Sequence, residues 1–597
     1  MMNATDMSLC QQALSFLKAG QPAQAGASLA RLSPAAQQHP DAFYLAALAC
    51  EGLGRTTDVE PLFVAAIERA PRNPVYKNSY ALFLSRQGLG AEAIAALESA
   101  VEMAPDHGEA WLNLALLRQE RGDLSEAAKA LARAEALAPD TPRVLAAAGA
   151  LAQAQGDCPR ARAALMKAVK QAPSDLAAVL RLAKALGQQG DFTAALAALG
   201  SADDPQLATT RADLLADAGR MEEAEAAYRA VATRWPHHTE ALTSHAFLLP
   251  QLGQRSAALD VFRAVLADDA PAQVWRAALA AARGINDGAT LLAWATEAEQ
   301  KFGPTAEWRL ARLTALRLQE RYSEALVEVR TEQVRFPGET ALANHRAWLA
   351  LRNGELDEAE TAALAVSRAT PLDQTAWSLL SIIWRLKNDT RESWLIDYDK
   401  LVMTRDLVVP TGWSNLTTFL SDLKSVLEQR HTTLNAPPEQ TLRGGTQTRG
   451  ELFATTDPVL LALRDSLGTT LEGCLAGLSH QAGHPFLGRL TGKARLAGSW
   501  SVRLQGLGHH VNHIHPQGWL SSAFYVALPP EMDADGDAGS LTFGSPDAGL
   551  GLSLVARRVV RPSAGKLTIF PSYVWHGTLP FQSTSSRLTA AFDALPV

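Results

Sequence analysis

Four histidines fall within the segment His509–Trp519, HHVNHIHPQGW, although the whole chain of 597 residues contains only 14. In an extended strand alternate side chains project from the same face, so the imidazoles of His513 and His515 would lie together. The segment FPSYVWHGTLPF, one strand unit further along, supplies His576. Neutral imidazole is the commonest protein ligand of transition metals. The spacing therefore predicts a metal site formed by these three histidines.

Three ligands from two strands would leave half of an octahedral metal open. Non-haem Fe(II) oxygenases need such an open face, usually with two histidines and one carboxylate. Arg587 lies eleven residues beyond His576, and Thr589 follows on the same face of the last predicted strand. A guanidinium binds a carboxylate through two parallel hydrogen bonds, and a neighbouring hydroxyl can share that role. The pattern predicts a dicarboxylate site beside the metal, although Arg587 could instead pair with Asp593.

Two further groups of residues are candidates for the wall of this pocket. Trp500 and Arg503, on a preceding predicted strand, either line the pocket or only pack against it. The polar segment RGGTQTRG, residues 443–450, contains Gln447 and Thr448. It is either a loop that faces the substrate or a simple hairpin at the start of the β region.

The composition limits what kind of protein positions these side chains. The chain is long enough for several domains, and its 47% hydrophobic and 20% charged residues are typical of globular proteins. A net charge of -7 offers no basic surface for nucleic acid or anionic lipid. The four cysteines are far apart, and neither a basic leader nor an apolar run of about 18 residues is visible. These features predict a cytoplasmic protein that binds neither nucleic acid nor membrane.

A period of 34 residues runs through the N-terminal two thirds of the chain. The glycines that mark it are Gly54, Gly88, Gly122 and Gly156, and the prolines are Pro71, Pro105, Pro139 and Pro173. The block EAWLNLALLRQERGDLSEAAKALARAEALAPDTP, residues 109–142, carries an amphipathic helical pattern on each side of its glycine. A helical hairpin of this kind cannot bury its apolar face alone, so successive hairpins must stack into a solenoid with a concave groove.

This period, with its glycine and proline, resembles the tetratricopeptide repeat. We expect about ten hairpins over residues 1–395, with degenerate ones near Phe192 and Val274. The groove is expected to bind a peptide or protein partner, and a plain spacer or dimerisation arm is the alternative. Residues that either line the groove or pack between helices are Tyr76, Asn113, Trp275 and Trp308.

The pattern changes over residues 396–597. A helical segment near residues 408–434 is followed, from about residue 443, by glycines and β-branched residues in short runs. The runs GSWSVRLQG, WLSSAFYVALPP, GSLTFGSP and KLTIFPS have the length and turn spacing of an all-β barrel or sandwich. The chain is therefore predicted to be multidomain, with an all-α solenoid followed by an all-β domain that has a few flanking helices.

The segments HVNHIHPQGWLSSAFYVALP, GSLTFGSP and PSAGKLTIFPSYVWHGTLPFQSTSSRLTAAFD together resemble the 2-oxoglutarate/Fe(II) oxygenase family that bacteria often fuse to tetratricopeptide repeats. The resemblance covers about residues 443–597. It implies a double-stranded β-helix (jelly-roll) fold that uses Fe(II), 2-oxoglutarate and O2. It makes His513 and His576 metal ligands, and assigns Arg587 and Thr589 to the distal carboxylate of 2-oxoglutarate. Tyr525 is a further candidate for that carboxylate.

The sequence departs from this family at one position. The usual motif is His-x-Asp or His-x-Glu, whereas the third position here is His515. Asp547 and Asp593 are the nearest acidic candidates on the predicted barrel, and neither has the right spacing. We expect His515 to be the third ligand because the spacing of two residues is kept. A third imidazole makes the site one charge more positive than a carboxylate would.

The expected function is a 2-oxoglutarate/Fe(II)-dependent dioxygenase that hydroxylates a peptide or protein presented by the solenoid. A small-molecule substrate stays open, with the repeats serving only for assembly. One alternative is a non-catalytic repeat scaffold with a degenerate, metal-binding, cupin-like barrel. Another is an all-histidine iron dioxygenase that needs no 2-oxoglutarate.

Overall fold

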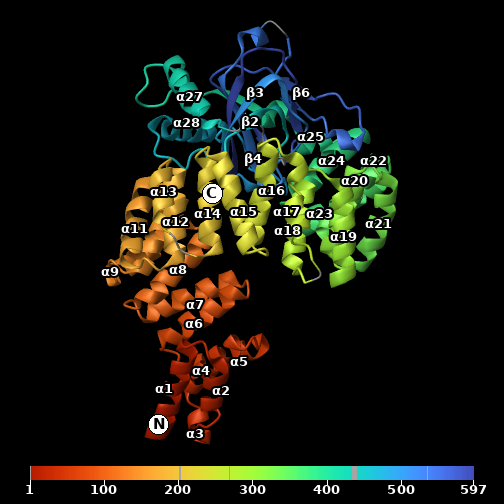
Figure 1. Ribbon diagram of the computed structural model, residues 1–597. Helices are drawn as coiled ribbons and strands as arrows, with labels where there is room; N and C mark the ends of the chain where they lie inside the picture. The colour runs from red at the N-terminus through yellow and green to blue at the C-terminus, as the bar shows by residue number, and fades with distance from the viewer. Residues whose placement is uncertain (1, 201–202, 268, 433–439, 534–535) are drawn as a thin grey trace. The chain divides into compact units, whose positions relative to one another are not determined.

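The computed structural model describes residues 2–200, 203–267, 269–432, 440–533 and 536–597. It divides into two compact units, Met1–Ala185 and Leu186–Val597. Helices form the first unit and the beginning of the second, and the strands all belong to the second (Figure 1). The predicted boundary between residues 395 and 396 lies inside the second unit and stays a prediction.

The first unit consists of antiparallel helix pairs. Its helices are α1 (Ala4–Lys18), α2 (Pro22–Leu29), α3 (Pro34–Gln37), α4 (Pro40–Gly52), α5 (Thr56–Arg69), α6 (Pro74–Arg86), α7 (Gly90–Met103), α8 (Gly108–Glu120), α9 (Leu124–Leu137), α10 (Pro142–Ala154), α11 (Cys158–Gln171) and α12 (Leu176–Gln188), the last of which extends into the second unit. Proline at the start of several of these helices suits the first turn, where its missing N–H would have no partner.

The second unit continues the hairpins. Its helices before the strands are α13 (Phe192–Ala198), α14 (Pro205–Asp217), α15 (Met221–Arg234), α16 (Thr239–Gln251), the 3-10 turn η1 (Arg255–Ala257), α17 (Asp260–Arg263), α18 (Ala272–Gly284), α19 (Gly288–Phe302), α20 (Ala306–Leu318), α21 (Tyr322–Arg335), α22 (Thr340–Arg352), α23 (Leu356–Ala369), α24 (Gln374–Leu386), α25 (Arg391–Leu395) and α26 (Tyr398–Leu401). The degenerate hairpin expected near Phe192 corresponds to the short helix α13. The one expected near Val274 corresponds to the short η1 and α17, which come just before α18, the regular helix that contains Val274.

A left-handed residue makes the turn inside each hairpin. In the described residues these are Gly20, Gly54, Gly88, Gly122, Gly156, Gly190, Gly219, Gly253, Asn286, Glu320, Gly354 and Asn388. Glycine adopts this backbone conformation without a Cβ clash, which explains why glycine recurs at most of these turns. The described residues contain twelve such turns, three of which use a residue other than glycine. The expected count of about ten hairpins stays a prediction.

The four aromatic and polar residues proposed for groove or packing roles are packing residues. Tyr76, Trp275 and Trp308 are buried. Asn113 is buried too, and its Nδ2 donates to Asn78 Oδ1 at 2.9 Å. None of them is therefore available to a ligand in the groove.

The β region contains two antiparallel sheets. The larger has the strand order β1-β7-β4-β9-β3-β2 and the smaller β6-β5-β8. Their bounds are β1 (Met403–Asp406), β2 (Leu442–Gln447), β3 (Ala494–His510), β4 (Leu520–Ala527), β5 (Leu541–Phe543), β6 (Arg558–Val560), β7 (Lys566–Pro571), β8 (His576–Thr578) and β9 (Arg587–Pro596). The fold class of an all-α solenoid followed by an all-β region is confirmed, while the jelly-roll topology stays a prediction.

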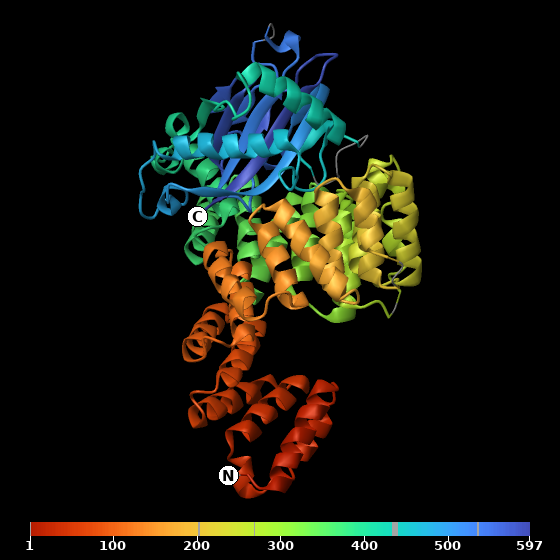
Figure 2. The same ribbon diagram turned by 90° about the vertical axis from the view of Figure 1, so that its left-hand side faces the viewer.

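Two helices, α27 (Leu416–Arg430) and α28 (Pro458–Leu475), lie across one face of the larger sheet (Figure 2). Short 3-10 turns fall between the strands at Leu487–Arg489, Pro530–Asp533 and Ala548–Leu550. The other face of the sheet is therefore the one left for a site. In the described part of the chain, no helix combines the length and apolar character that crossing a membrane requires.

The solenoid and the β region of the second unit share one hydrophobic core. It runs without interruption from Leu313 on α20 to Ala594 on β9. Arg385 on α24 donates to the carbonyls of Gly544 and Val555 at 2.9 and 2.8 Å. Through this core and these hydrogen bonds, the helices α20–α25 pack against the β region and hold it in place.

A second contact joins the β region to earlier hairpins. Arg449, just after β2, donates to Asp217 Oδ1 on α14 at 2.8 Å and to Gln251 Oε1 on α16 at 3.3 Å. Its side chain lies close to Asp213 and Tyr228 as well. The sheets are thus fixed to two separate stretches of the solenoid.

Candidate metal centre

A short bridge between two chain segments brings the histidines together. His513 and His576 exchange backbone hydrogen bonds of 2.9 and 3.0 Å, so the loop after β3 pairs with β8. The backbone N–H of His515 donates to the carbonyl of Ser572 at 3.0 Å. These bonds fix the backbone of all three predicted ligands, and their ligand atoms lie within 4.8 Å of one another.

Hydrogen bonds set the same tautomer in the three imidazoles. Nδ1 lies 2.8 Å from the carbonyl oxygen of Val511 in His513, and 2.9 Å from that of Val574 in His576. In His515 it lies 2.8 and 2.9 Å from the two carboxylate oxygens of Asp593. Each acceptor requires a proton on Nδ1, so a neutral ring presents the lone pair of Nε2.

These lone pairs converge. Nε2 of His515 lies 3.2 Å from Nε2 of His513. Two acceptors at this distance repel each other, and a bound cation would turn the repulsion into coordination. A set of three nitrogen donors with their outer nitrogens already bonded is the arrangement seen around transition metals. The residues therefore fit a divalent transition metal.

The surroundings keep the imidazoles of His513 and His576 neutral. Burial lowers the pKa of His513 to about 4, and neighbouring His515 contributes to that lowering. Burial holds the pKa of His576 well below its ordinary value, and this ring also packs against Phe570 at a centroid distance of 4.5 Å. Neutral rings at neutral pH are the form that binds a metal.

The predicted carboxylate-binding residues lie on one face of the larger sheet. Thr589 on β9 is directly opposite Tyr525 on β4, and residues opposite each other in a ladder share a face. Arg587, two residues earlier on β9, shares that face. Its guanidinium lies 5.1 Å from the centre of the Tyr525 ring. The two-residue spacing of Arg587 and Thr589 predicted that they share a face, and the structure places them together with Tyr525.

This group carries unused hydrogen-bonding capacity. Arg587 is 2% exposed, and its Nη1 donates to the carbonyl of Gly539 at 2.8 Å. Its Nε and the hydroxyl of Tyr525 are buried without a partner in the described residues. Burial lowers the pKa of Arg587 and raises that of Tyr525. Buried polar groups are normally bonded, so these donors point to an anionic ligand.

The four other predicted pocket residues are divided between the two faces. Trp500 stacks on the His515 ring at a centroid distance of 5.8 Å, so it lines the site. Gln447 is opposite Val502, which is itself opposite Thr589, and so faces the same side. Thr448 is buried and accepts a hydrogen bond from the backbone of Ser501 at 2.9 Å.

Arg503 lies on the other face. It is opposite Leu588, one residue out of phase with Arg587 and Thr589. There it lies near His431, whose ring contacts Thr446 Oγ1 at 2.9 Å and Ser501 Oγ at 3.1 Å. The structure therefore does not bring Arg503 together with the pocket residues.

Asp593 is the site residue whose contact the sequence did not reveal: it was considered as a direct metal ligand or as the partner of Arg587, and the structure bonds it to His515 Nδ1 instead. It lies on β9 at an even spacing from Arg587 and Thr589, which is the signal that could have placed it on the same face. Asp547, the other acidic candidate, instead accepts a hydrogen bond from Trp348 Nε1 on α22 at 3.3 Å.

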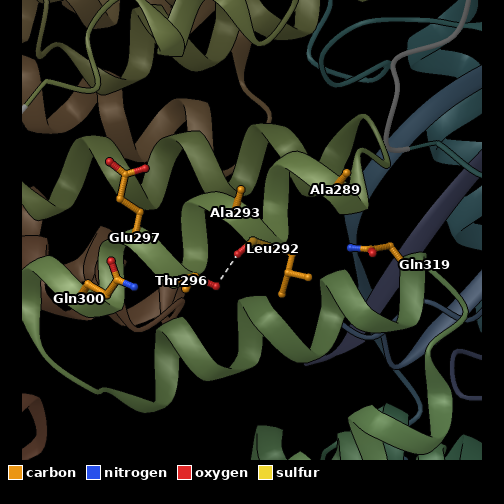
Figure 3. Close-up of a pocket in the computed structure, with 7 residues that line it drawn as sticks. All are labelled: Ala289, Leu292, Ala293, Thr296, Glu297, Gln300 and Gln319. Carbon is orange, nitrogen blue, oxygen red and sulfur yellow. Dashed lines mark hydrogen bonds between the residues drawn. The ribbon is translucent and has the colours of Figure 1, made fainter.

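A hollow in the solenoid has no part in this site. It runs along α19 and is lined by Ala289, Leu292, Ala293, Thr296, Glu297, Gln300 and Gln319 (Figure 3). The Thr296 hydroxyl donates to the carbonyl of Leu292 at 2.8 Å. Its residues include no histidine or cysteine, so it offers no comparable donor set.

Comparison with known proteins separates the two halves in the same way. Residues 498–593 match the family model described as "Putative 2OG-Fe(II) oxygenase". Tetratricopeptide-repeat models match residues 84–151 and residues 10–74, 147–208 and 345–393. The chain matches a repeat–oxygenase fusion. No curated protein matches it.

Several solved structures resemble the repeats. The pilF protein of Pseudomonas aeruginosa is 16% identical over 40% of this chain and 97% of its own, with a TM-score of 0.29. A thermophilic repeat protein of Thermus thermophilus, TTC0263, is 25% identical over 30% of this chain and 98% of its own, with a TM-score of 0.28. Naa15/Naa10 bound to HypK-THB is 17% identical over 65% and 67% of the chains, with a TM-score of 0.24. Similarities this distant carry no functional information for this chain.

Proposed function

We propose that the protein is an Fe(II)- and 2-oxoglutarate-dependent dioxygenase that hydroxylates a peptide or protein substrate in the cytoplasm. The observation that carries this proposal is the convergence of three Nε2 lone pairs beside the buried, incompletely bonded pair Arg587 and Tyr525. The match of residues 498–593 to an oxygenase family supports it.

In this proposal His513, His515 and His576 hold the metal. Bound Fe(II) would supply open coordination positions and the redox chemistry that couples O2 to the decarboxylation of 2-oxoglutarate into succinate and CO2. The protein supplies position and environment. The acceptors on Nδ1 lock each ring with Nε2 toward the metal, and aromatic neighbours such as Phe570 keep water from the inner side.

Arg587 would bind the distal carboxylate of 2-oxoglutarate. Its Nε–H and the Tyr525 O–H are buried donors without a partner in the described residues, and the hydroxyl of Thr589 lies on the same face. Thr589 Oγ1 is 3.4 Å from the carbonyl of Val502, so that hydroxyl can turn toward a ligand at little cost. Charge-assisted bonds of this kind orient a dicarboxylate as well as bind it.

Trp500 and Gln447 lie on the same face of the sheet as Thr589. Gln447 lies two residues before Arg449, which contacts the solenoid at α14 and α16. The wall of the site is therefore joined directly to the repeats. This connection supports a peptide or protein substrate held by the solenoid over a small molecule, with Trp500 and Gln447 as its nearest contacts.

Anaerobic titration of the Fe(II)-loaded protein with 2-oxoglutarate tests the proposal. We expect a visible metal-to-ligand charge-transfer band that is lost in His515→Ala and weakened in Arg587→Ala. His509→Ala is the matched control, because His509 lies outside the ligand set. No band in protein that holds stoichiometric iron would refute the 2-oxoglutarate assignment.

A second candidate is favoured by the three-histidine donor set, which no described carboxylate completes. It is an all-histidine iron dioxygenase that needs no cosubstrate. Oxygen uptake without succinate formation would distinguish it from the first proposal.

A further inference from the structure

We infer that Asp593 is a positioning residue that supplies, through His515, the negative charge that a third imidazole removes from the metal centre. This inference rests on the proposed metal site and adds a residue to it. Both oxygens of the Asp593 carboxylate lie within hydrogen-bond distance of His515 Nδ1, at 2.8 and 2.9 Å. The side chains are only 18% and 16% exposed, so solvent weakens this contact much less than a surface ion pair.

The three histidines differ in what holds their outer nitrogen. His513 and His576 each donate to the carbonyl of the residue two positions earlier, which is a neutral and local acceptor. Of the three, His515 alone donates to a carboxylate, and that carboxylate comes from a strand 78 residues away. A charged acceptor makes a stronger hydrogen bond and raises the basicity of the ligand nitrogen on the far side of the ring.

The carboxylate is itself held in place. The hydroxyl of Ser521 on β4 donates to Asp593 Oδ1 at 2.7 Å and lies 2.9 Å from Ser572 Oγ. The backbone of Gly518 packs closely against the same two side chains, since a Cβ there would come within 2.3 Å of Ser572 Oγ and 3.5 Å of the Asp593 carboxyl carbon. The same Ser572 accepts the backbone N–H of His515 through its carbonyl. One packed group of residues thus fixes the acid and the ligand together.

The charges explain why the arrangement matters. Two histidines and a carboxylate reduce the charge of a divalent metal by one, whereas three neutral imidazoles leave it unchanged. Asp593 restores that negative charge from the far side of the His515 ring, whereas a carboxylate ligand would carry it directly on the metal. The centre then has the overall charge of a two-histidine, one-carboxylate site while all three of its protein donors are nitrogen.

The test is metal binding by Asp593→Asn, which keeps the shape of the side chain and removes its charge. We expect Co(II), titrated anaerobically into the full chain, to bind about 10- to 100-fold more weakly than to the wild type. Asp406→Asn is the matched control, because Asp406 is an acid of the same sheet that bonds Lys566 on the surface. It should leave the Co(II) affinity unchanged.

Proton NMR of the Co(II) protein separates positioning from a merely structural role. Three imidazoles that carry Nδ1–H should give three exchangeable, strongly shifted resonances. Asp593→Asn should move one of them and leave the other two in place, which general loosening of the fold would not do. If Asp593→Asn does not fold, Ser521→Ala replaces it, with a several-fold weaker affinity and a shift of the same resonance expected.

Unchanged Co(II) affinity and three unchanged resonances, in whichever of the two variants folds, would overturn the inference. The outcome is independent of 2-oxoglutarate. A wild type that binds Co(II) but shows no charge-transfer band with Fe(II) and 2-oxoglutarate would refute the proposed activity and leave the role of Asp593 standing. A wild type that binds no Co(II) would refute both.

Discussion

Replacing Arg587 with methionine should change stability and ligand binding in opposite directions. Among the described residues the buried side chain bonds only the carbonyl of Gly539, and its Nε has no partner. Methionine fills a similar volume without a charge. Replacing even a buried ion pair with apolar residues of similar volume is often neutral or stabilising by about 1–4 kcal/mol, and in the described chain the Arg587 charge has no buried carboxylate partner to lose. We therefore expect the protein without ligand to be at least as stable as the wild type.

Binding of 2-oxoglutarate should suffer. A hydrogen bond to a charged group contributes about 1.5–3 kcal/mol, and every 1.4 kcal/mol is a tenfold change in affinity. Loss of one or two such bonds from the Arg587 guanidinium predicts about 100-fold weaker binding. The stabilisation of the wild type by saturating ligand should disappear with it, because that stabilisation follows the affinity.

The assay is a urea unfolding series with and without 2-oxoglutarate, in the presence of a redox-inert divalent metal, together with calorimetric binding. Arg503→Met is the matched control, since the Nε of Arg503 is also buried without a partner in the described chain but lies on the opposite face of the sheet. It should leave the affinity for 2-oxoglutarate unchanged. A strongly destabilised Arg587→Met that still binds 2-oxoglutarate normally would show that the guanidinium is structural and that the carboxylate binds elsewhere.

Two further predictions concern stability. Burial, and then the positive charge of Arg503, lower the pKa of His431 to about 4. As the pH falls, the unfolded chain binds a proton at this histidine before the folded protein does, because the ordinary pKa of histidine is about 6.5. The stability that His431 contributes is therefore complete above about pH 6.5 and is lost as the pH falls toward 4, by about 3 kcal/mol. The stability deficit of His431→Gln should therefore shrink between pH 7 and pH 4 in urea melts, and an unchanged deficit would contradict the assignment. Glu320 adopts a φ of 59° at a hairpin turn, a conformation that glycine adopts without strain. Glu320→Gly should therefore raise the free energy of unfolding by about 1 kcal/mol and raise the melting temperature. A lower melting temperature would show that the Glu320 side chain itself stabilises the turn.

Much of the solenoid could be predicted because its turns repeat. Glycine with a positive φ at 34-residue intervals specifies where each helix must stop. Asn286, Glu320 and Asn388 make the same turn without glycine, and a pattern based on residue type passes over them. Asparagine tolerates the left-handed region, but glutamate there depends on packing of the hairpin, which no local signal reveals.

The site was predictable to the extent that strand parity determines it. Parity placed His513 with His515, and Arg587 with Thr589. The same rule would have excluded Arg503, because it is three residues from Trp500 and an odd spacing reverses the face. It would also have included Asp593. The partner of Asp593 could not be predicted, because a contact across 78 residues depends on how β9 and the loop after β3 meet.

Because the sheets are attached to the solenoid at two points, the repeats between those points must have a fixed combined length. Arg449 reaches α14 and α16, while Arg385 on α24 holds the loop near Gly544 and Val555. The hairpins between these points must span a set distance at a set angle. Insertion or deletion of one 34-residue repeat there would carry one attachment away from its partner. The number of repeats in this stretch should therefore be as strictly constrained as a residue of the site.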